Sequence, residues 1–344
     1  MELLSDNPIV SVIIPVYNAE PYLKIMLDSI NKQTYENYEF IFIDDQSTDN
    51  SIKILQLESS KNNRIKIATR TRLPKGAPTC RNIGLSLANG KYLIYIDSDD
   101  LISKTFLEDR VRFMEDNPEC DYATFRGGTV TIIDDKIKYG TKVWGEAKSK
   151  DMLSDFLSTQ YPFSIWNNIY RREIFKDFYW DEKLKVYQDF DFAVIAILSN
   201  FNHAFANNKN LDYFYRSGVI NNISSNFITE EKYQSTKYLF NKIWTELSKK
   251  KDNIKYKKSF SKFFILQYTR LLVKGSDAQI IDYITFCQKY LNKLTILKMK
   301  LVYKIQKVFL IFNRHQEFII KLLVMIFYYP ENIILFLKHK VKFH

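Results

Sequence analysis

Alternating buried strands and amphipathic helices in the first hundred residues constrain the fold of this 344-residue chain most strongly. The continuous apolar run at residues 9–17 predicts a strand that is buried on both faces, and a second apolar run covers 38–43. Two further strands are predicted at 64–69 and 91–97. Between these runs, apolar side chains recur at helical spacing. Strands and helices that alternate in this way form a mostly parallel sheet through right-handed crossovers. The sequence therefore predicts an α/β fold, in which a Rossmann-like sheet is flanked by helices.

Turn-forming and acidic residues gather where three of these predicted strands end. The residues at these ends are Pro15, Val16, Asn18, Asp44, Asp45, Asp97, Ser98, Asp99 and Asp100. Open parallel sheets bind their ligands beyond the carboxyl ends of the strands. A single aspartate there is usually a helix cap, but several carboxylates at one edge raise one another's pKa and destabilise the fold. The D-x-D-D sequence at 97–100 therefore indicates an oxygen-ligand site for Mg²⁺ or Mn²⁺.

Several other kinds of site and segment are disfavoured by the sequence. There is no G-x-x-x-x-G-K-[ST] loop, and no G-x-G-x-x-G follows a strand, so Walker-type and dinucleotide sites are not predicted. Cys80, Cys120 and Cys287 have no C-x-x-C spacing, which disfavours structural disulfides and a thiolate zinc site. The first residues lack a basic region and a cleavage site, so no signal peptide is predicted. We therefore expect a cytoplasmic protein.

The net charge of +11 is distributed unevenly along the chain. Residues 231–344 contain 23 Lys and Arg against 7 Asp and Glu, whereas the remaining residues contain 27 against 32. Helical spacing dominates the basic part and predicts a helix with two different faces. The lysine face contains Lys293, Lys300, Lys304 and Lys307. The apolar face contains Leu297, Leu301, Ile305, Val308 and Phe309. Basic amphipathic helices suit an anionic membrane surface. The alternative is a helical bundle with a solvated basic face, and no motif accompanies the charge to predict a nucleic-acid partner.

The most hydrophobic stretch of the chain covers residues 318–337. It is interrupted by Lys321, Pro330 and Glu331. A spanning helix needs about 20 apolar residues, so a transmembrane helix is not predicted. We expect instead a peripheral position on the inner face of the cytoplasmic membrane.

Five short segments together resemble a known family. They are VSVIIPVYN at 10–18, IDDQSTDNS at 43–51, RNIGL at 81–85, NGKY at 89–92 and IDSDD at 96–100. In this order and spacing they are similar to the motifs of the family-2 inverting glycosyltransferases with the GT-A fold, the type that builds bacterial capsules, lipopolysaccharides and other surface glycans. The resemblance implies a metal-dependent transfer, with inversion, of a hexose or N-acetylhexosamine. The donor would be a nucleotide diphosphate-sugar and the acceptor a glycan hydroxyl.

The resemblance also implies a nucleoside pocket at the ends of the first two strands. Asp45 would bind the base of the nucleotide, which would be uracil, with Asp44 beside it. The backbone around Pro15, Val16 and Asn18 would form the floor of this pocket.

The diphosphate and the metal would lie at the end of the fourth strand. The resemblance implies that Arg81 faces the phosphates, where a guanidinium can bind two oxygens at once. Asp97 and Asp99, with Ser98 between them, would hold Mn²⁺ or Mg²⁺ on the diphosphate. A divalent cation there stabilises the charge that develops on the leaving group.

Inversion requires a general base that removes the proton of the acceptor hydroxyl. In the family that this chain resembles, the base lies in an E-D pair at the start of a helix, and Asp189 in the segment QDFDF falls at that position. The alternative is that Asp189 only caps the apolar helix 190–198. Gln188 stands where Glu is usual, so the pKa of Asp189 should be lower than in an acidic pair.

Two further departures from the family pattern concern the donor side. Asn168 replaces the usual Lys, and Pro74 and Pro78 stiffen the loop before Arg81. These changes leave catalysis in place as the expectation but leave the donor sugar open.

We expect a GT-A domain over residues 1–225 and a helical, basic region over 226–344. The nucleotide-sugar-binding half would cover about 1–103 and the acceptor-binding half about 104–225. The expected partners are a UDP-sugar, a glycan or lipid-linked glycan acceptor and an anionic membrane surface, but no nucleic acid. Two alternatives stay open: a non-catalytic membrane scaffold that binds nucleotide-sugar, and a metal-dependent nucleotidyltransferase, which would need a glycine-rich triphosphate loop that this sequence lacks.

Overall fold

The computed structural model describes residues 9–133, 136–206, 210–218, 229–309, 320, 323–324 and 327–328. The chain divides into two compact units. The first consists of Met1–Phe156 and Gln160–Ser225, and the second consists of Leu157–Thr159 and Asn226–His344.

A seven-stranded sheet forms the centre of the first unit. Its strands, in spatial order, are β10 (His203–Phe205), β6 (Tyr122–Thr124), β9 (Asn168–Arg171), β4 (Tyr92–Tyr95), β1 (Val10–Val16), β2 (Tyr38–Asp44) and β3 (Ile65–Thr69). The four strands from β4 to β3 are parallel, and β9 runs antiparallel to both of its neighbours. All residues of β2 and β4 are buried, as expected for strands covered on both faces. The predicted mostly parallel sheet is therefore confirmed.

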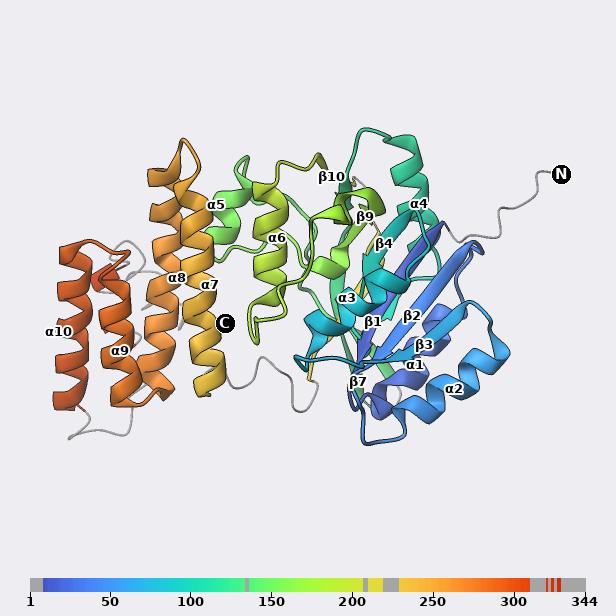
Figure 1. Ribbon diagram of the computed structural model, residues 1–344, viewed down its shortest axis with the longest axis horizontal. Coiled ribbons are helices and arrows are strands. Elements are labelled where there is room, and N and C mark those ends of the chain that lie inside the picture. Colours follow the sequence, from blue (N-terminus) through green and yellow to red (C-terminus); the bar gives the residue numbers. More distant parts are fainter. Residues whose placement is uncertain are drawn as a thin grey trace. The chain divides into compact units, whose positions relative to one another are not determined.

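Helices cover both faces of this sheet (Figure 1). Those of the first unit are α1 (Glu20–Ile30), α2 (Ser51–Lys61), α3 (Ala77–Leu87), α4 (Phe106–Asp116), α5 (Met152–Leu157) and α6 (Gln188–Leu198), with the short 3-10 helices η1 (Ile165–Asn167) and η2 (Arg172–Lys176). The helix α3 packs on β1 and β2, and Gly84 permits the close approach, because a Cβ atom there would lie 2.4 Å from Ile13 Cγ2. This contact fixes α3 against the strands whose ends form the site.

A second sheet of four strands lies in the same unit. Its order is β5 (Leu101–Ile102), β11 (Tyr213–Arg216), β7 (Gly127–Ile133) and β8 (Lys136–Tyr139). β11 pairs with β5 antiparallel and with β7 parallel. Since β5 follows β4 after only a short turn, this sheet brings β11 next to the aspartates that end β4.

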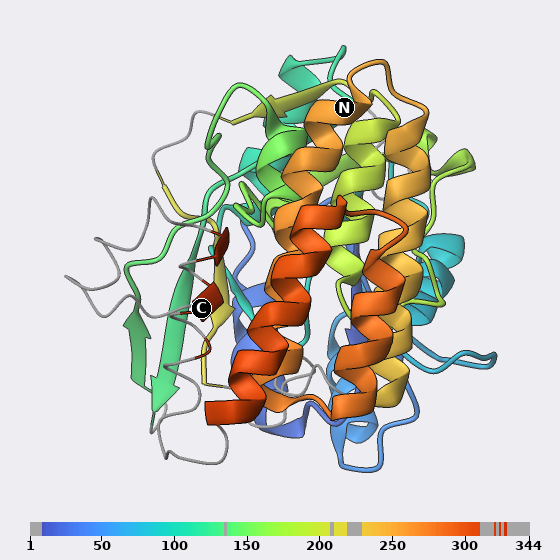
Figure 2. The same cartoon turned by 90° about the vertical axis from the view of Figure 1, so that its left-hand side faces the viewer.

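The described part of the second unit contains the helices α7 (Glu230–Ser248), α8 (Asn253–Lys274), α9 (Asp277–Cys287) and α10 (Lys293–Phe309) (Figure 2). Their core is aromatic: Phe240, Phe260, Phe263 and Phe264 pack with ring centroids 4.4–6.0 Å apart. The helical nature of the basic region is thereby confirmed. Among the described residues, no helix has the length and apolar character that a bilayer span requires. The hydrophobic stretch predicted at 318–337 falls almost entirely outside the described residues.

Candidate active site

The loops that follow β1 and β2 are fixed to one another by hydrogen bonds. The Asn18 backbone N–H donates to Ser47 Oγ (3.0 Å), and the Thr48 N–H donates to Asn18 Oδ1 (2.8 Å). The Asp45 N–H donates to the Val16 carbonyl (2.7 Å). Asn18 has a positive φ of 49°, a conformation that asparagine tolerates better than most residues. The predicted residues of the first two strand ends, with the half-buried Pro15 beside Val16, thus lie together at one edge of the sheet.

Asp44 and Asp45 are neighbours in sequence but differ in their surroundings. Both are buried, and the carboxylate of Asp44 accepts hydrogen bonds from the Ser47 N–H, 3.2 Å from each oxygen. Asp45 forms an ion pair with Arg70, which is itself buried and donates a further hydrogen bond to the Arg72 carbonyl (2.7 Å). Asp44 therefore stabilises the turn, whereas Asp45 and Arg70 form a buried pair at the sheet edge. Sequence reasoning missed Arg70, although its place directly after β3 was a signal.

Arg81, near the start of α3, connects two of the predicted site residues. Its side chain is buried, its Nη2 lies 2.8 Å from Asp97 Oδ1, and its Nη1 lies 3.7 Å from Asp189 Oδ1. The guanidinium also stacks on the indole of Trp180, 4.3 Å from the ring centroid. Within the described part of the chain, its buried Nε and Nη1 groups donate no hydrogen bond. A buried cation with unused donors is suited to an anionic ligand.

Asp189 lies in the first turn of α6, and its side chain is 43% exposed. Tyr187, which precedes the helix, has a φ of 58°, a left-handed conformation that is rare for an aromatic residue. Desolvation raises the pKa of Asp189 to about 6, and the nearby charge of Asp97 also raises it. The charge of Arg81 and a hydrogen bond with Ser164 lower the pKa, but by less. A carboxylate with such a pKa can accept a proton near neutral pH.

The side-chain amide of Gln188 does not face Asp189. Its Nε2 donates instead to the Leu184 carbonyl (3.1 Å). The raised pKa of Asp189 therefore arises without an adjacent acidic partner in the sequence.

The aspartates of the 97–100 motif have two kinds of environment. Asp97 is 32% exposed and Asp99 is half-buried, and desolvation together with Asp97 raises the pKa of Asp99 to about 6. Asp100 is only 1% exposed; it accepts hydrogen bonds from the Tyr213 hydroxyl and from the Arg216 N–H (2.6 Å). Asp100 thus connects β11 to the end of β4.

A divalent cation fits the donors that Asp97 and Asp99 supply. Two partly exposed carboxylates, with the half-buried Ser98 between them, form a hard oxygen donor set suited to Mg²⁺ or Mn²⁺. In the described ranges, no three His, Cys, Asp or Glu side chains gather as a complete metal site.

A network of side chains holds the segment around Trp180 against α3. The Asn82 side chain exchanges hydrogen bonds with the Trp180 backbone (3.0 Å in each direction) and donates to Glu182 Oε1 (2.7 Å). Glu182 in turn forms an ion pair with Arg72 in the loop before α3. This network fixes the indole on which Arg81 stacks, and it joins residues too far apart in the chain to be predicted from a local pattern.

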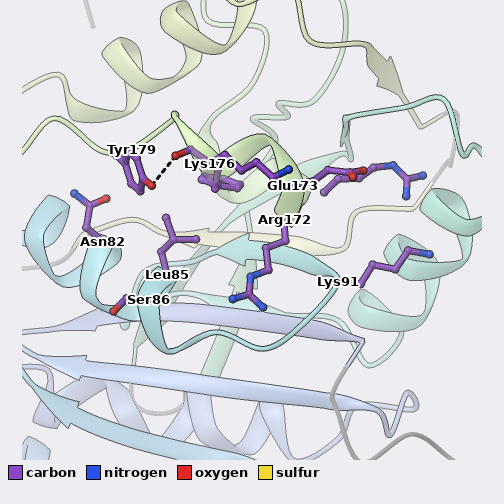
Figure 3. Close-up of a pocket in the computed structure, with 10 residues that line it drawn as sticks. Asn82, Leu85, Ser86, Lys91, Arg172, Glu173, Lys176 and Tyr179 are labelled. Carbon is purple, nitrogen blue, oxygen red and sulfur yellow. Dashed lines mark hydrogen bonds between the residues drawn. The ribbon is translucent and has the colours of Figure 1, made fainter.

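A cavity of about 600 Å³ lies elsewhere, between α3 and η2 (Figure 3). Leu85 and Ser86 line it from α3, and Arg172 and Lys176 line it from η2, with Tyr179 beyond them. None of the site residues predicted from the sequence lines this cavity. The strand-end cluster and this cavity are therefore separate features.

Comparison with known proteins shows which family and which fold this chain is similar to. Residues 11–178 match the family model described as glycosyl transferase family 2. The crystal structure of S. aureus TarS 1-349 in complex with UDP-GlcNAc superposes with a TM-score of 0.64 over 86% of each chain, at 22% sequence identity. At that identity the likeness concerns the fold.

Two curated relatives show the sequence similarity. An uncharacterized glycosyltransferase of Haemophilus influenzae is 44% identical over 112 residues, which are 33% of this chain and 44% of the relative. The UDP-Glc:alpha-D-GlcNAc-diphosphoundecaprenol beta-1,3-glucosyltransferase WfgD of Escherichia coli is 39% identical over 113 residues, which are 33% of this chain and 43% of that protein. The matched stretches thus span less than half of these two relatives. The family match, these relatives and the shared fold agree with one another: residues 11–178 form a domain of glycosyltransferase family 2, and the fold is GT-A.

Proposed function

We propose that this protein transfers a hexose or N-acetylhexosamine from a UDP-sugar to a hydroxyl of a bacterial surface glycan or lipid-linked oligosaccharide, with inversion at the anomeric carbon. The observation that carries the proposal is the position of Arg81, between Asp97 of the strand-end motif and Asp189 at the start of α6. One guanidinium with unused donors faces both a candidate metal ligand and a candidate base.

Asp189 is the proposed general base. It takes the proton from the acceptor hydroxyl as the hydroxyl oxygen bonds to the anomeric carbon, and the bond from that carbon to the diphosphate oxygen breaks. Its partial exposure leaves it accessible to an acceptor, and its pKa of about 6 keeps it ionised at neutral pH while leaving it basic enough to take a proton. Arg81 would donate its unused N–H groups to the diphosphate.

Asp97 and Asp99 are the proposed ligands of Mn²⁺ or Mg²⁺. A divalent cation between these carboxylates and the diphosphate would stabilise the negative charge of the leaving group. The raised pKa of Asp99 supports this role, because a carboxylate that is costly to ionise in the free protein gains from a neighbouring cation.

Asp45 is the proposed partner of the uracil base, and Arg70 holds its carboxylate in place. The backbone of Pro15, Val16 and Asn18 lies at the same edge of the sheet and would form the floor of the nucleoside pocket. The donor is proposed as a UDP-sugar because the TarS structure contains UDP-GlcNAc and the name of WfgD includes UDP-Glc. The name of WfgD also includes alpha-D-GlcNAc-diphosphoundecaprenol, which supports a lipid-linked acceptor. A peripheral position on the inner face of the cytoplasmic membrane is part of the proposal.

A thermal-shift panel of UDP, GDP, dTDP and CMP, each with and without Mn²⁺, tests the donor site. We expect UDP to raise Tm, and we expect Mn²⁺ to increase the rise. Asp99→Ala should abolish the effect of Mn²⁺, whereas Asp116→Ala, at the distant end of α4, should not change it. If none of the nucleotides shifts Tm, the proposed donor site is wrong.

A further inference from the structure

Helix α10 is apolar on two sides, and one of them is packed. Ile296, Met299 and Val302 are at most 8% exposed. The hydroxyl of Tyr268 in α8 donates a hydrogen bond to the Met299 carbonyl (2.6 Å), and α10 also contacts α9. This side of α10 therefore belongs to the core of the second unit.

Three leucines lie on the other side of α10. Leu294, Leu297 and Leu301 are 63%, 63% and 43% exposed. Because residues three and four positions apart share a helix face, these side chains form one continuous leucine strip. Leu297 and Leu301 belong to the apolar face predicted from the sequence, and both are exposed in the structure. Single exposed leucines are ordinary on a protein surface, whereas a contiguous apolar strip marks a binding surface.

A row of lysines runs beside the leucine strip. Lys293, Lys300 and Lys304 are spaced by seven and four residues, so they share a face, and all three are exposed. The helix contains five lysines and no Asp or Glu. The other two, Lys298 and Lys307, have partners within the second unit. The lysine row is therefore available to an anionic partner.

We propose that the leucine strip and the lysine row bind the surface of an anionic phospholipid bilayer, with α10 lying in the plane of the membrane. Amphipathic helices of this kind place their apolar side chains at the boundary between headgroups and acyl chains. Lysines at the edge of such a strip meet the negative potential of anionic headgroups. The inference goes beyond glycosyl transfer, since the binding requires neither donor nor acceptor.

Charge favours a bilayer over a second copy of the chain. In a two-fold symmetric dimer the same patch would face itself, so each lysine row would approach another lysine row. Like charges at short range oppose such a contact. An anionic bilayer offers both an apolar layer for the leucines and negative charge for the lysines.

Co-sedimentation of the full chain with sucrose-loaded vesicles tests this proposal. We expect binding to vesicles of phosphatidylcholine with phosphatidylglycerol and much weaker binding to phosphatidylcholine alone. The triple variant Leu294→Gln/Leu297→Gln/Leu301→Gln should weaken binding at least about tenfold. The triple variant Lys293→Gln/Lys300→Gln/Lys304→Gln should weaken binding to the anionic vesicles by about fivefold per lysine, and only at low salt.

A matched control uses three aliphatic residues of similar exposure in the first unit. Leu57, Ile133 and Leu87 are 64%, 65% and 44% exposed, and changing them together to Gln should leave vesicle binding unchanged. Equal loss in this control, or undiminished binding by the leucine variant, would overturn the proposal. So would a wild-type dimer, measured by light scattering, that the leucine changes dissociate without any vesicle binding. Donor turnover without vesicles should stay at the wild-type level in the leucine variant, which separates this proposal from the proposed chemistry.

Discussion

At the scale of single residues, Arg81 has the most constrained position in the site. Its guanidinium faces Asp97 at 2.8 Å and Asp189 at 3.7 Å, and it stacks on Trp180. A lysine would supply the charge but not the planar fork of donors. Arg81 lowers the pKa of Asp189, whereas burial and Asp97 raise it, so the base strength of Asp189 depends on this one side chain.

Measuring donor turnover as a function of pH tests whether Arg81 sets the pKa of Asp189. The ionised form of Asp189 is the active one, so turnover should be lost as the pH falls through about 6 in the wild type. Arg81→Gln removes the group that lowers the pKa of Asp189, and the acidic limb of the kcat/KM profile should move to higher pH. The exposed Arg112 of α4 provides the control, and Arg112→Gln should leave the limb in place. An unmoved limb in Arg81→Gln would show that Arg81 does not tune the base.

In the protein without bound metal, the ionised side chain of Asp99 should lower the free energy of unfolding at neutral pH. Burial raises its pKa to about 6, above the value of about 3.9 in an unfolded chain, so the folded state disfavours the charged form. The stability associated with this group is therefore present at low pH and is lost as the pH rises from about 4 to about 6. In EDTA at pH 7.5, Asp99→Asn should raise Tm by about 2–5 °C. At pH 4 the two proteins should melt alike; an equal rise at both pH values would contradict the assignment to titration.

At the scale of elements, the segment around Trp180 depends on α3 for its position. Asn82 makes three hydrogen bonds to this segment, and their loss in Asn82→Ala should lower the free energy of unfolding by about 1–3 kcal/mol. Because the indole of Trp180 supports Arg81, the KM for the donor should also rise. Ser86→Ala on the same helix removes only a hydrogen bond to the Ile83 carbonyl, and it should change neither quantity. A stability loss in Asn82→Ala without any change in KM would separate Trp180 from the site.

Elements set by local pattern could be predicted from the sequence, and those set by distant pairing could not. The strands β1, β2 and β4 follow from buried apolar runs, β3 follows from its β-branched residues, and the helices between them follow from helical spacing. The antiparallel insertion of β9, and the second sheet that joins Tyr213 to Asp100, depend on contacts between segments far apart in the chain. No local pattern encodes such contacts.

The same distinction applies within the site and in the second unit. The aspartates at the strand ends could be found because they follow recognisable strands, whereas the pairing of Asp45 with Arg70 depends on tertiary structure. In α10, periodicity predicts an apolar face but cannot decide which of two apolar faces is packed. The structure shows that Met299 belongs to the packed face and Leu297 to the exposed one.

At the scale of the whole molecule, the two ends of the chain differ in charge. Residues 231–344 have 23 basic and 7 acidic side chains, whereas the preceding residues have 27 and 32. An anionic donor is therefore not attracted by the net charge of the catalytic part. Under the proposed function, donor binding depends on local cations, namely Arg81 and the proposed divalent metal, and the basic excess is available to the anionic bilayer proposed above.

The most direct test of the central claim compares Asp189→Asn with the wild type. Turnover of a UDP-sugar and the dissociation constant of UDP would be measured in parallel, with Asp109→Asn, in the first turn of α4, as the control. Loss of a general base typically costs about 10²–10⁴ in rate. The account predicts a loss of that size in Asp189→Asn with nearly unchanged UDP affinity and a control that behaves as the wild type. Turnover within tenfold of the wild type would contradict the assignment of Asp189 as the base.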